Sequence, residues 1–467
     1  MRRARSPRRP WWPMSSTASN TVPVAGSSAP GTSARCSWHL APCSGWRRNE
    51  PLVSTFRGFA PRPKGIYPII DGLLHAELLP ADAAEQLTAG ERHHRDPFVG
   101  VTVDGTPAPG LFPLLDATVS TRAAALAARC YLDTLAPHQR TVAALPMDSP
   151  NWRRWTNAFP TWAPKGLQLG RLSEPQRRAA LDLIEASLSR AGFTTVRAAM
   201  RLNGALGELI DDYRDSLREF SYWLTIFGDP AGGDPWGWQV MGHHVDLHCV
   251  FIGNQVVFAP VFLGAEPAVA EHDNYAGLRC FDAETDRGLD LRRAMTAAQE
   301  DQVLLGRSMR TADLPPELAG PFNGRHLAGA GADNLVRPFE GIPAAALTAD
   351  QQDLLMELIG VYVGRMPAGH AGAKIDQVRE HLDRTYFAWR GEHGDTSPFY
   401  YRVHSPVILI EYDNHPGIFL DNEEPERFHI HTIVREPNGN DYGKDLLRQH
   451  YERFHKDRGP GTTSWPP

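Results

Sequence analysis

The sequence predicts an α+β fold with an internal duplication, in which two helix-then-hairpin units related by a pseudo-twofold axis form one globular body. Two observations support this prediction. A helix-start pattern recurs at a constant offset, and each recurrence is followed by helices and then by apolar, strand-like runs. The chain has 467 residues, of which 42% are apolar, so it can bury a substantial core.

The recurring helix-start pattern is a capping box. Ser173 with Gln176 forms one box, and Thr348 with Gln351 forms the other, at an offset of 348 − 173 = 175 residues. In such a box the hydroxyl accepts a hydrogen bond from the third helical N–H, and the glutamine side chain returns to the N–H of the cap. Two ordinary helices with a common start signal would also give this pattern. The apolar residues that follow at matching positions favour a duplication.

The periodicity of apolar residues and the positions of Gly and Pro place the remaining elements. Helices are expected at 118–145 with a break at Pro137, and at 172–191, 196–223, 290–306, 348–365, 375–388 and 443–455. Strands are expected within 236–267, 400–412 and 428–435. The predicted organisation is a disordered basic tail or mis-assigned start (1–60), an irregular lead-in (61–129), a first repeat unit (130–290), a second repeat unit (291–456) and a disordered C-terminal tail (457–467).

The amino-terminal segment differs in charge from the rest of the chain. Its first 50 residues contain eight arginines and one glutamate, a charge of +7, and since the whole chain carries −6, the remainder carries −6 − 7 = −13. An acidic body argues against a nucleic-acid partner. The segment has the arginines of a transit-like or twin-arginine export signal but lacks the apolar stretch of a signal peptide. We therefore expect a cytoplasmic protein, with export through this segment as the alternative.

Several other classes of function are disfavoured. No apolar run approaches the roughly 18 residues that a membrane span needs, so no membrane partner is expected. The chain has no GxxxxGK[ST] phosphate loop and no GxSxG nucleophile elbow, so we expect neither a nucleotide cofactor nor a serine nucleophile. A small-molecule substrate or ligand is the expected partner, and the sequence leaves the oligomeric state open.

Two short histidine clusters carry the most specific chemistry in the chain. His243 and His244 begin one strand-like run, and His429 and His431 lie in another. Because side chains alternate along a strand, His429 and His431 should share one face, about 6.6 Å apart at Cα, where both can bind one metal ion. His244 should share a face with His248, whereas His243 should point to the opposite face. Satisfied core histidines are the alternative for any one of these residues.

Charged residues near these clusters are further candidates. Overlaying 236–240 on 399–403 places Glu411 over His248, so we expect Glu411 to be a metal ligand, a general base or a buried partner of Arg402. Asp441 is expected first as the cap of the last helix and second as a site residue. Glu266 and Arg279 are weaker candidates.

At these residues the chain resembles a known family, the domain-of-unknown-function family 3500. The resemblance covers roughly residues 130–456. It rests on the motifs Trp236-Gly237-Trp238, Gly242-His243-His244, Pro260-Val261-Phe262-Leu263-Gly264-Ala265-Glu266-Pro267, Ile410-Glu411-Tyr412-Asp413, His429-Ile430-His431 and Asp441-Tyr442-Gly443. It implies kinship of fold and no particular reaction.

The leading functional hypothesis is a metal-dependent enzyme with its site between the two repeat units. His243 or His244 together with His429 and His431 would bind a divalent transition metal, zinc or copper, and Glu411 would be a ligand or base. Metal-activated water attacking a small polar substrate is slightly favoured over metal redox chemistry. The alternative is a non-catalytic protein that binds a small ligand or a metal.

Overall fold

The structure of the protein is a computed structural model. It describes residues 55–62, 69–70, 73–74, 93–115, 119–159, 161, 164–210, 213–319 and 325–455, which belong to one structural unit that begins at Val53. The predicted C-terminal tail and nearly all of the predicted basic tail lie outside these residues. Of the basic tail, residues 55–60 are described, and there Phe56 packs edge-on against Phe428.

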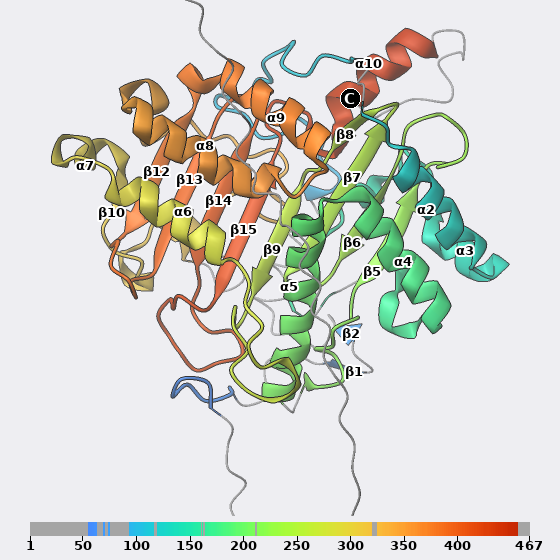
Figure 1. Cartoon of the computed structure of the whole chain (residues 1–467), viewed down its shortest axis with the longest axis horizontal. Coiled ribbons are helices and arrows are strands. Elements are labelled where there is room, and N and C mark those ends of the chain that lie inside the picture. Colours follow the sequence, from blue (N-terminus) through green and yellow to red (C-terminus); the bar gives the residue numbers. More distant parts are fainter. Residues whose placement is uncertain are drawn as a thin grey trace, which may run out of the picture. The chain divides into compact units, whose positions relative to one another are not determined.

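One large mixed sheet organises the described residues and crosses the whole unit (Figure 1). Its strand order is β10-β12-β13-β14-β15-β9-β7-β6-β5-β3, with β11 beside β12, β4 beside β5 and β8 beside β7. The strands are β3 (Ala144–Leu145), β4 (Leu167–Gln168), β5 (Trp223–Phe227), β6 (Trp236–Met241), β7 (Val245–Ile252), β8 (Gln255–Val257), β9 (Val261–Ala265), β10 (Leu304–Gly306), β11 (Ile342–Pro343), β12 (Tyr386–Gly391), β13 (Phe399–His404), β14 (Leu409–Asn414) and β15 (Ile430–Arg435). A separate short hairpin pairs β1 (Ile69–Ile70) with β2 (Leu73–Leu74).

Helices cover one face of this sheet (Figure 1). On that face Tyr401 of β13 donates a hydrogen bond to the carbonyl of Glu284, and Trp238 of β6 donates one to Ser187. The α-helices are α2 (Arg122–Asp133), α3 (Pro137–Ala143), α4 (Glu174–Ser187), α5 (Arg190–Leu209), α6 (Asp282–Arg293), α7 (Ala297–Val303), α8 (Ala349–Val363), α9 (Ala368–Glu380) and α10 (Lys444–Phe454). No helix in the described part of the chain is long and apolar enough to cross a membrane.

Both predicted capping boxes are present. Ser173 begins α4 and Thr348 begins α8, and in each box the hydroxyl accepts from the N–H of the glutamine three residues later. The glutamines also reach outside their own helices. Gln176 bonds Gln139 at 2.9 Å, and Gln351 makes the corresponding 2.9 Å contact with Gln299. The recurring glutamine therefore joins two consecutive helix starts in each half of the chain.

The two halves of the sheet have the same order of elements. From the central antiparallel pair β9–β15, the strands run β7, β6, β5 and β3 on one side and β14, β13, β12 and β10 on the other. The outermost strand on each side, β3 or β10, is parallel to its neighbour, and every other pair is antiparallel. The β6–β7 register pairs Gln239 with His248, while the β13–β14 register pairs Arg402 with Glu411.

Several predicted element boundaries are wrong. The helix expected at 196–223 ends at Leu209, and the apolar run Trp223–Phe227 forms β5. The helix expected at 375–388 is instead α9, which ends at Glu380, and the aromatic run from Tyr386 forms β12. In both places a run rich in aromatic residues, with β-branched Thr225 and Ile226 in β5, suits a pleated surface, and pairing with neighbouring strands outweighs local helical periodicity.

Candidate metal centre

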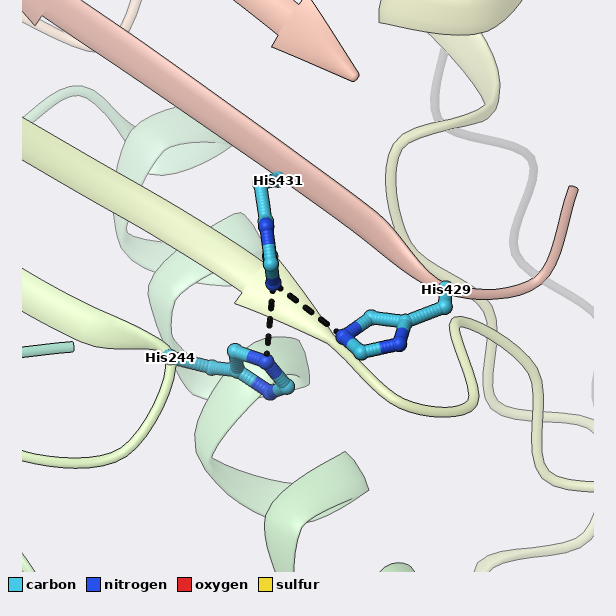
Figure 2. A group of neighbouring side chains, drawn as sticks. All are labelled: His244, His429 and His431. Atoms are coloured by element: carbon cyan, nitrogen blue, oxygen red, sulfur yellow. Dashed lines mark hydrogen bonds between the residues drawn. The ribbon is translucent and has the colours of Figure 1, made fainter. Parts of the chain in front are cut away.

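Three buried imidazoles from both halves of the chain converge at the β9–β15 junction. His431 lies in β15, His429 lies directly before it, and His244 lies in the turn between β6 and β7. The Nε2 atom of His431 is 3.1 Å from Nε2 of His429 and 3.2 Å from Nε2 of His244 (Figure 2). Of the two histidines predicted from the first unit, His244 therefore joins the cluster.

Local backbone geometry brings His244 to this place. It adopts a left-handed conformation with φ of 64°, which turns the chain into β7 instead of extending the strand as predicted. Its carbonyl accepts a hydrogen bond of 2.8 Å from the N–H of Gly264 in β9. A Cβ atom on Gly264 would lie 3.0 Å from the His431 ring and 3.1 Å from the His244 ring. The missing side chain at Gly264 thus leaves the space in which the two imidazoles meet.

A hydrogen bond on the far side of the ring fixes which nitrogen of His429 carries the proton. Nδ1 of His429 donates to the carbonyl of Pro416 at 2.7 Å, whereas Nδ1 of His431 has no hydrogen-bond partner among the described residues and lies 3.5 Å from the Asp413 carboxylate. A neutral imidazole has one N–H, so protonation at Nδ1 leaves a lone pair at Nε2. The Nε2 lone pair of His429 therefore faces Nε2 of His431 at 3.1 Å. It can accept a hydrogen bond from a protonated Nε2 of His431, or it can bind a cation if His431 carries its proton at Nδ1, beside the Asp413 carboxylate.

The electrostatics of the cluster keep the imidazoles neutral. Burial lowers the pKa of His244 and of His429 well below the ordinary value, and the neighbouring imidazoles lower both further. Burial also lowers the pKa of His431, although the Asp413 carboxylate offsets part of this effect. Neutral imidazoles are the form that binds metal ions.

The spacing of the nitrogens matches a metal site. A tetrahedral ion with metal–nitrogen distances of about 2.0–2.1 Å holds its ligand nitrogens about 3.3 Å apart. The two close contacts are 3.1 and 3.2 Å, and all three ligand atoms lie within 4.8 Å of one another. These three histidines could hold a metal ion, and imidazole ligands without thiolates suit zinc, copper or iron.

A second group of buried ligand atoms shares His431. It consists of His326, Asp413 and His431, also within 4.8 Å of one another. Asp413 accepts from Nδ1 of His326 at 2.8 Å and from the N–H of Arg325 at 3.2 Å. Burial alone would raise the pKa of Asp413, but the adjacent imidazoles of His431 and His326 lower it well below its usual range. Asp413 is therefore an ionised carboxylate that orients His431.

The prediction from sequence did not include three residues of this neighbourhood, namely Asp413, His326 and His415. The ring of His415 lies 4.8 Å from that of His429 and 4.9 Å from that of His431 between centroids, and burial lowers its pKa to about 3. Strand alternation could have identified Asp413, because it follows Glu411 by two residues and shares its face. His326 lies in an irregular segment far away in sequence, so no local pattern pointed to it.

The structure places two other predicted histidines beside the cluster or away from it. His243 stacks on His244 with ring centroids 3.9 Å apart, but its Nδ1 donates to Asn203 at 2.8 Å. Both ring nitrogens of His248 have partners, since Nδ1 donates to the carbonyl of Pro260 at 2.8 Å and Nε2 contacts Gln239 at 2.7 Å. Neither residue belongs to the groups of convergent ligands found among the described residues.

Glu411 and Arg402 form a buried polar network of their own. One carboxylate oxygen of Glu411 accepts from the hydroxyl of Tyr400 at 2.6 Å, and the other accepts from the N–H of Ala328 at 2.7 Å. Arg402 donates to the same tyrosine hydroxyl at 3.2 Å and forms an ion pair with Glu340. Thus Glu411 holds the segment that contains Ala328 against β14, and its link to Arg402 passes through Tyr400.

Glu266 is the predicted carboxylate that lies next to the cluster. Its Oε1 accepts from three consecutive backbone N–H groups, at residues 418, 419 and 420, and its Oε2 lies 3.7 Å from Nδ1 of His429. Burial raises the pKa of Glu266 to about 7, although the three N–H groups oppose this shift. Glu266 therefore fixes the loop whose Pro416 carbonyl orients His429.

The two remaining candidates have structural partners. Asp441 does not cap the last helix as predicted, because the residue at the cap of α10 is Gly443. Asp441 instead accepts from the N–H of Glu436 at 2.8 Å and pairs with buried Arg435 at 3.2 Å. Arg279 forms an exposed ion pair with Asp282.

Comparison with known proteins agrees with the resemblance found in the sequence. No curated protein and no solved structure matches the chain. One family profile matches residues 117–444, a span that contains every strand from β3 to β15 and all three convergent histidines. The chain belongs to the family described as a protein of unknown function, DUF3500.

Proposed function

We propose that the protein binds one divalent transition-metal ion, zinc or copper, through Nε2 of His244, His429 and His431. The observation that carries this proposal is the approach of three neutral imidazoles within 3.1 and 3.2 Å while Nδ1 of His429 is engaged elsewhere. The Nε2 lone pair of His429 is buried and points at the other two Nε2 atoms, where a cation could bind all three. The carboxylate behind His431 also matches the outer-shell partner that metal-binding histidines usually have.

The proposed metal serves catalysis. Three protein ligands leave a coordination position for water or substrate, as in catalytic zinc sites, whereas structural zinc sites have four protein ligands. A divalent ion in this position would polarise a bound water or a substrate oxygen. Hydrolysis of a small polar substrate is therefore the proposed reaction, ahead of metal redox chemistry.

Glu266 lies on the side of His429 opposite the proposed metal, because its Oε2 is 3.7 Å from Nδ1 of that ring. It would therefore be an outer-shell partner of this ligand and not a base for a metal-bound water. Both oxygens of Glu411 already accept hydrogen bonds from Tyr400 or from the backbone. Glu411 could act as a base only after losing these partners.

One observation favours a second function, a closed metal site without catalysis. The ring of His415 lies within 4.9 Å of the rings of both His429 and His431, so a rotation of its side chain could supply a fourth nitrogen. A four-histidine shell would make the metal structural. Cobalt substitution separates the two functions. An open site should change its visible spectrum when azide is added, whereas a closed site should not.

Metal analysis of the purified protein tests the proposal. The wild-type chain should contain one equivalent of zinc or copper, and a His429→Ala/His431→Ala double variant should have lost it. The matched control is His243→Ala, which removes a neighbouring and equally buried imidazole that is hydrogen-bonded to Asn203. Circular dichroism shows whether each variant is folded. Equal metal content in the wild-type protein and the folded double variant would refute the metal site.

We also propose that the two halves of the chain arose by duplication and are related by a pseudo-twofold axis. The mirrored strand order, the two parallel outer strands and the paired glutamines in both halves support this proposal. The cross-strand pairs Gln239–His248 and Arg402–Glu411 agree with the overlay from sequence that matched His248 with Glu411. Superposing 130–290 on 291–456 tests it, with Gln176 expected to fall on Gln351.

A further inference from the structure

A second group of metal-ligand atoms lies at the surface, on elements that take no part in the buried cluster. It consists of His450 in α10, His455 just beyond the end of α10, and Asp234 in the turn between β5 and β6. The three ligand atoms lie within 4.8 Å of one another. The group joins the last helix of the described chain to a hairpin turn more than 200 residues earlier.

The geometry of this group is that of a partly assembled coordination shell. The Nε2 atoms of His450 and His455 are 3.2 Å apart, and Nε2 of His455 lies 3.5 Å from the carboxylate of Asp234. A tetrahedral ion with ligand distances of about 2.0–2.2 Å needs ligand atoms about 3.3–3.5 Å apart. The side chain of His455 is 11% exposed and that of Asp234 is 54% exposed, so one side of the group faces solvent.

The backbone at the end of α10 makes this convergence specific. Residues five apart on a helix point about 140° away from each other, so an uninterrupted helix would separate His450 from His455. The helix ends at Phe454, and His455 leaves it with φ of −125° while its N–H still bonds the carbonyl of Tyr451. This change of direction brings the ring of His455 to 5.1 Å from that of His450.

We infer that His450, His455 and Asp234 form a second, exchangeable site for a divalent transition-metal ion, zinc in particular. Two imidazoles and one carboxylate suit zinc, copper or nickel and are poor ligands for calcium or magnesium, which prefer all-oxygen shells. Water would complete the shell from the exposed side. The bound ion would fasten the end of α10 to the β5–β6 turn, so it would stabilise the fold. This inference does not depend on the buried cluster.

Zinc titration of the full chain tests this site. Protein that has been stripped with a chelator is titrated with zinc chloride in a calorimeter, and melting temperatures are measured with and without zinc. The His450→Ala variant should bind one equivalent less than the wild-type protein and should lose part of the zinc-dependent rise in melting temperature. The His429→Ala/His431→Ala variant should keep the surface equivalent. His138→Ala, which removes an exposed histidine of α3, is the matched control.

The outcomes separate this inference from the buried metal site. If the wild-type protein binds one equivalent of zinc and His450→Ala binds none, the result supports the surface site and refutes the buried site. If that equivalent of zinc is lost only in the His429→Ala/His431→Ala variant, the result supports the buried site and refutes the surface site. If His450→Ala and His455→Ala both bind as much zinc as the wild-type protein, the surface group is an ion pair and a hydrogen bond, and the inference is overturned.

Discussion

Replacing Asp413 by asparagine removes a charge behind the proposed metal ligand His431 and leaves the shape of the side chain unchanged. An amide oxygen can still accept from His326 at the present 2.8 Å, but the amide nitrogen then faces the N–H of Arg325, so that 3.2 Å hydrogen bond is lost. The variant also loses the negative charge 3.5 Å from Nδ1 of His431, which makes that imidazole a better electron donor. Loss of such an outer-shell partner weakens metal binding by about 10- to 100-fold, or roughly 1.4–2.8 kcal/mol.

Competition for zinc against a chromogenic chelator at pH 7 measures this change. The matched control is Asp246→Asn on β7. Asp246 is also fully buried, and burial raises its pKa well above the usual range, but it belongs to none of the groups of convergent ligand atoms among the described residues. Asp246→Asn should therefore bind zinc as the wild-type protein does. A dissociation constant for Asp413→Asn within twofold of wild type, or an equal loss in both variants, would contradict the assigned role of Asp413.

Three further variants test other parts of the structure. In Gly264→Ala the new Cβ would lie 2.7 Å from the carbonyl oxygen of Ile430 and 3.0–3.1 Å from the rings of His431 and His244. Because the backbone and both rings would have to shift, metal content should fall and urea unfolding should show a loss of about 1–3 kcal/mol. His404 is buried, and burial is the main cause that lowers its pKa to about 3. Below pH 6.5 this imidazole is therefore protonated in the unfolded chain but stays neutral in the folded chain, so the folded state loses stability as the pH falls. Urea unfolding at pH 7 and pH 5 measures this effect. The free energy of unfolding of His404→Phe, relative to that of the wild-type protein, should be about 2 kcal/mol higher at pH 5 than at pH 7. The same relative free energy at both pH values would count against a buried neutral imidazole. Gln176→Ala and Gln351→Ala should each lower the unfolding free energy by about 1–2 kcal/mol in urea, and a large disparity would argue against equivalent halves.

The two capping boxes and the faces of the strands were predictable because they depend on short-range rules. A hydroxyl and a glutamine three residues apart satisfy helix N–H groups wherever they occur, and both predicted boxes are present. His429 and His431 share a face because side chains alternate in an extended chain. The same rule failed at His244, where a left-handed backbone conformation replaces the expected strand. The predicted end of the helix near Tyr386 was also wrong, because pairing with a neighbouring strand decided the local structure there.

By itself, the sequence determined the α+β class, the family, and the two short histidine clusters from which the three convergent imidazoles come, since these follow from composition, periodicity and motifs. Tertiary structure alone decided which histidines meet. The pairing of Gly264 in β9 with His431 in β15 and the turn at His244 bring three Nε2 atoms together, while His248 is taken up by Gln239. The roles of Asp413 and Glu266 are also tertiary, because each depends on partners more than 80 residues away in sequence. Side-chain chemistry is local, but a coordination shell depends on distances that only the folded chain sets.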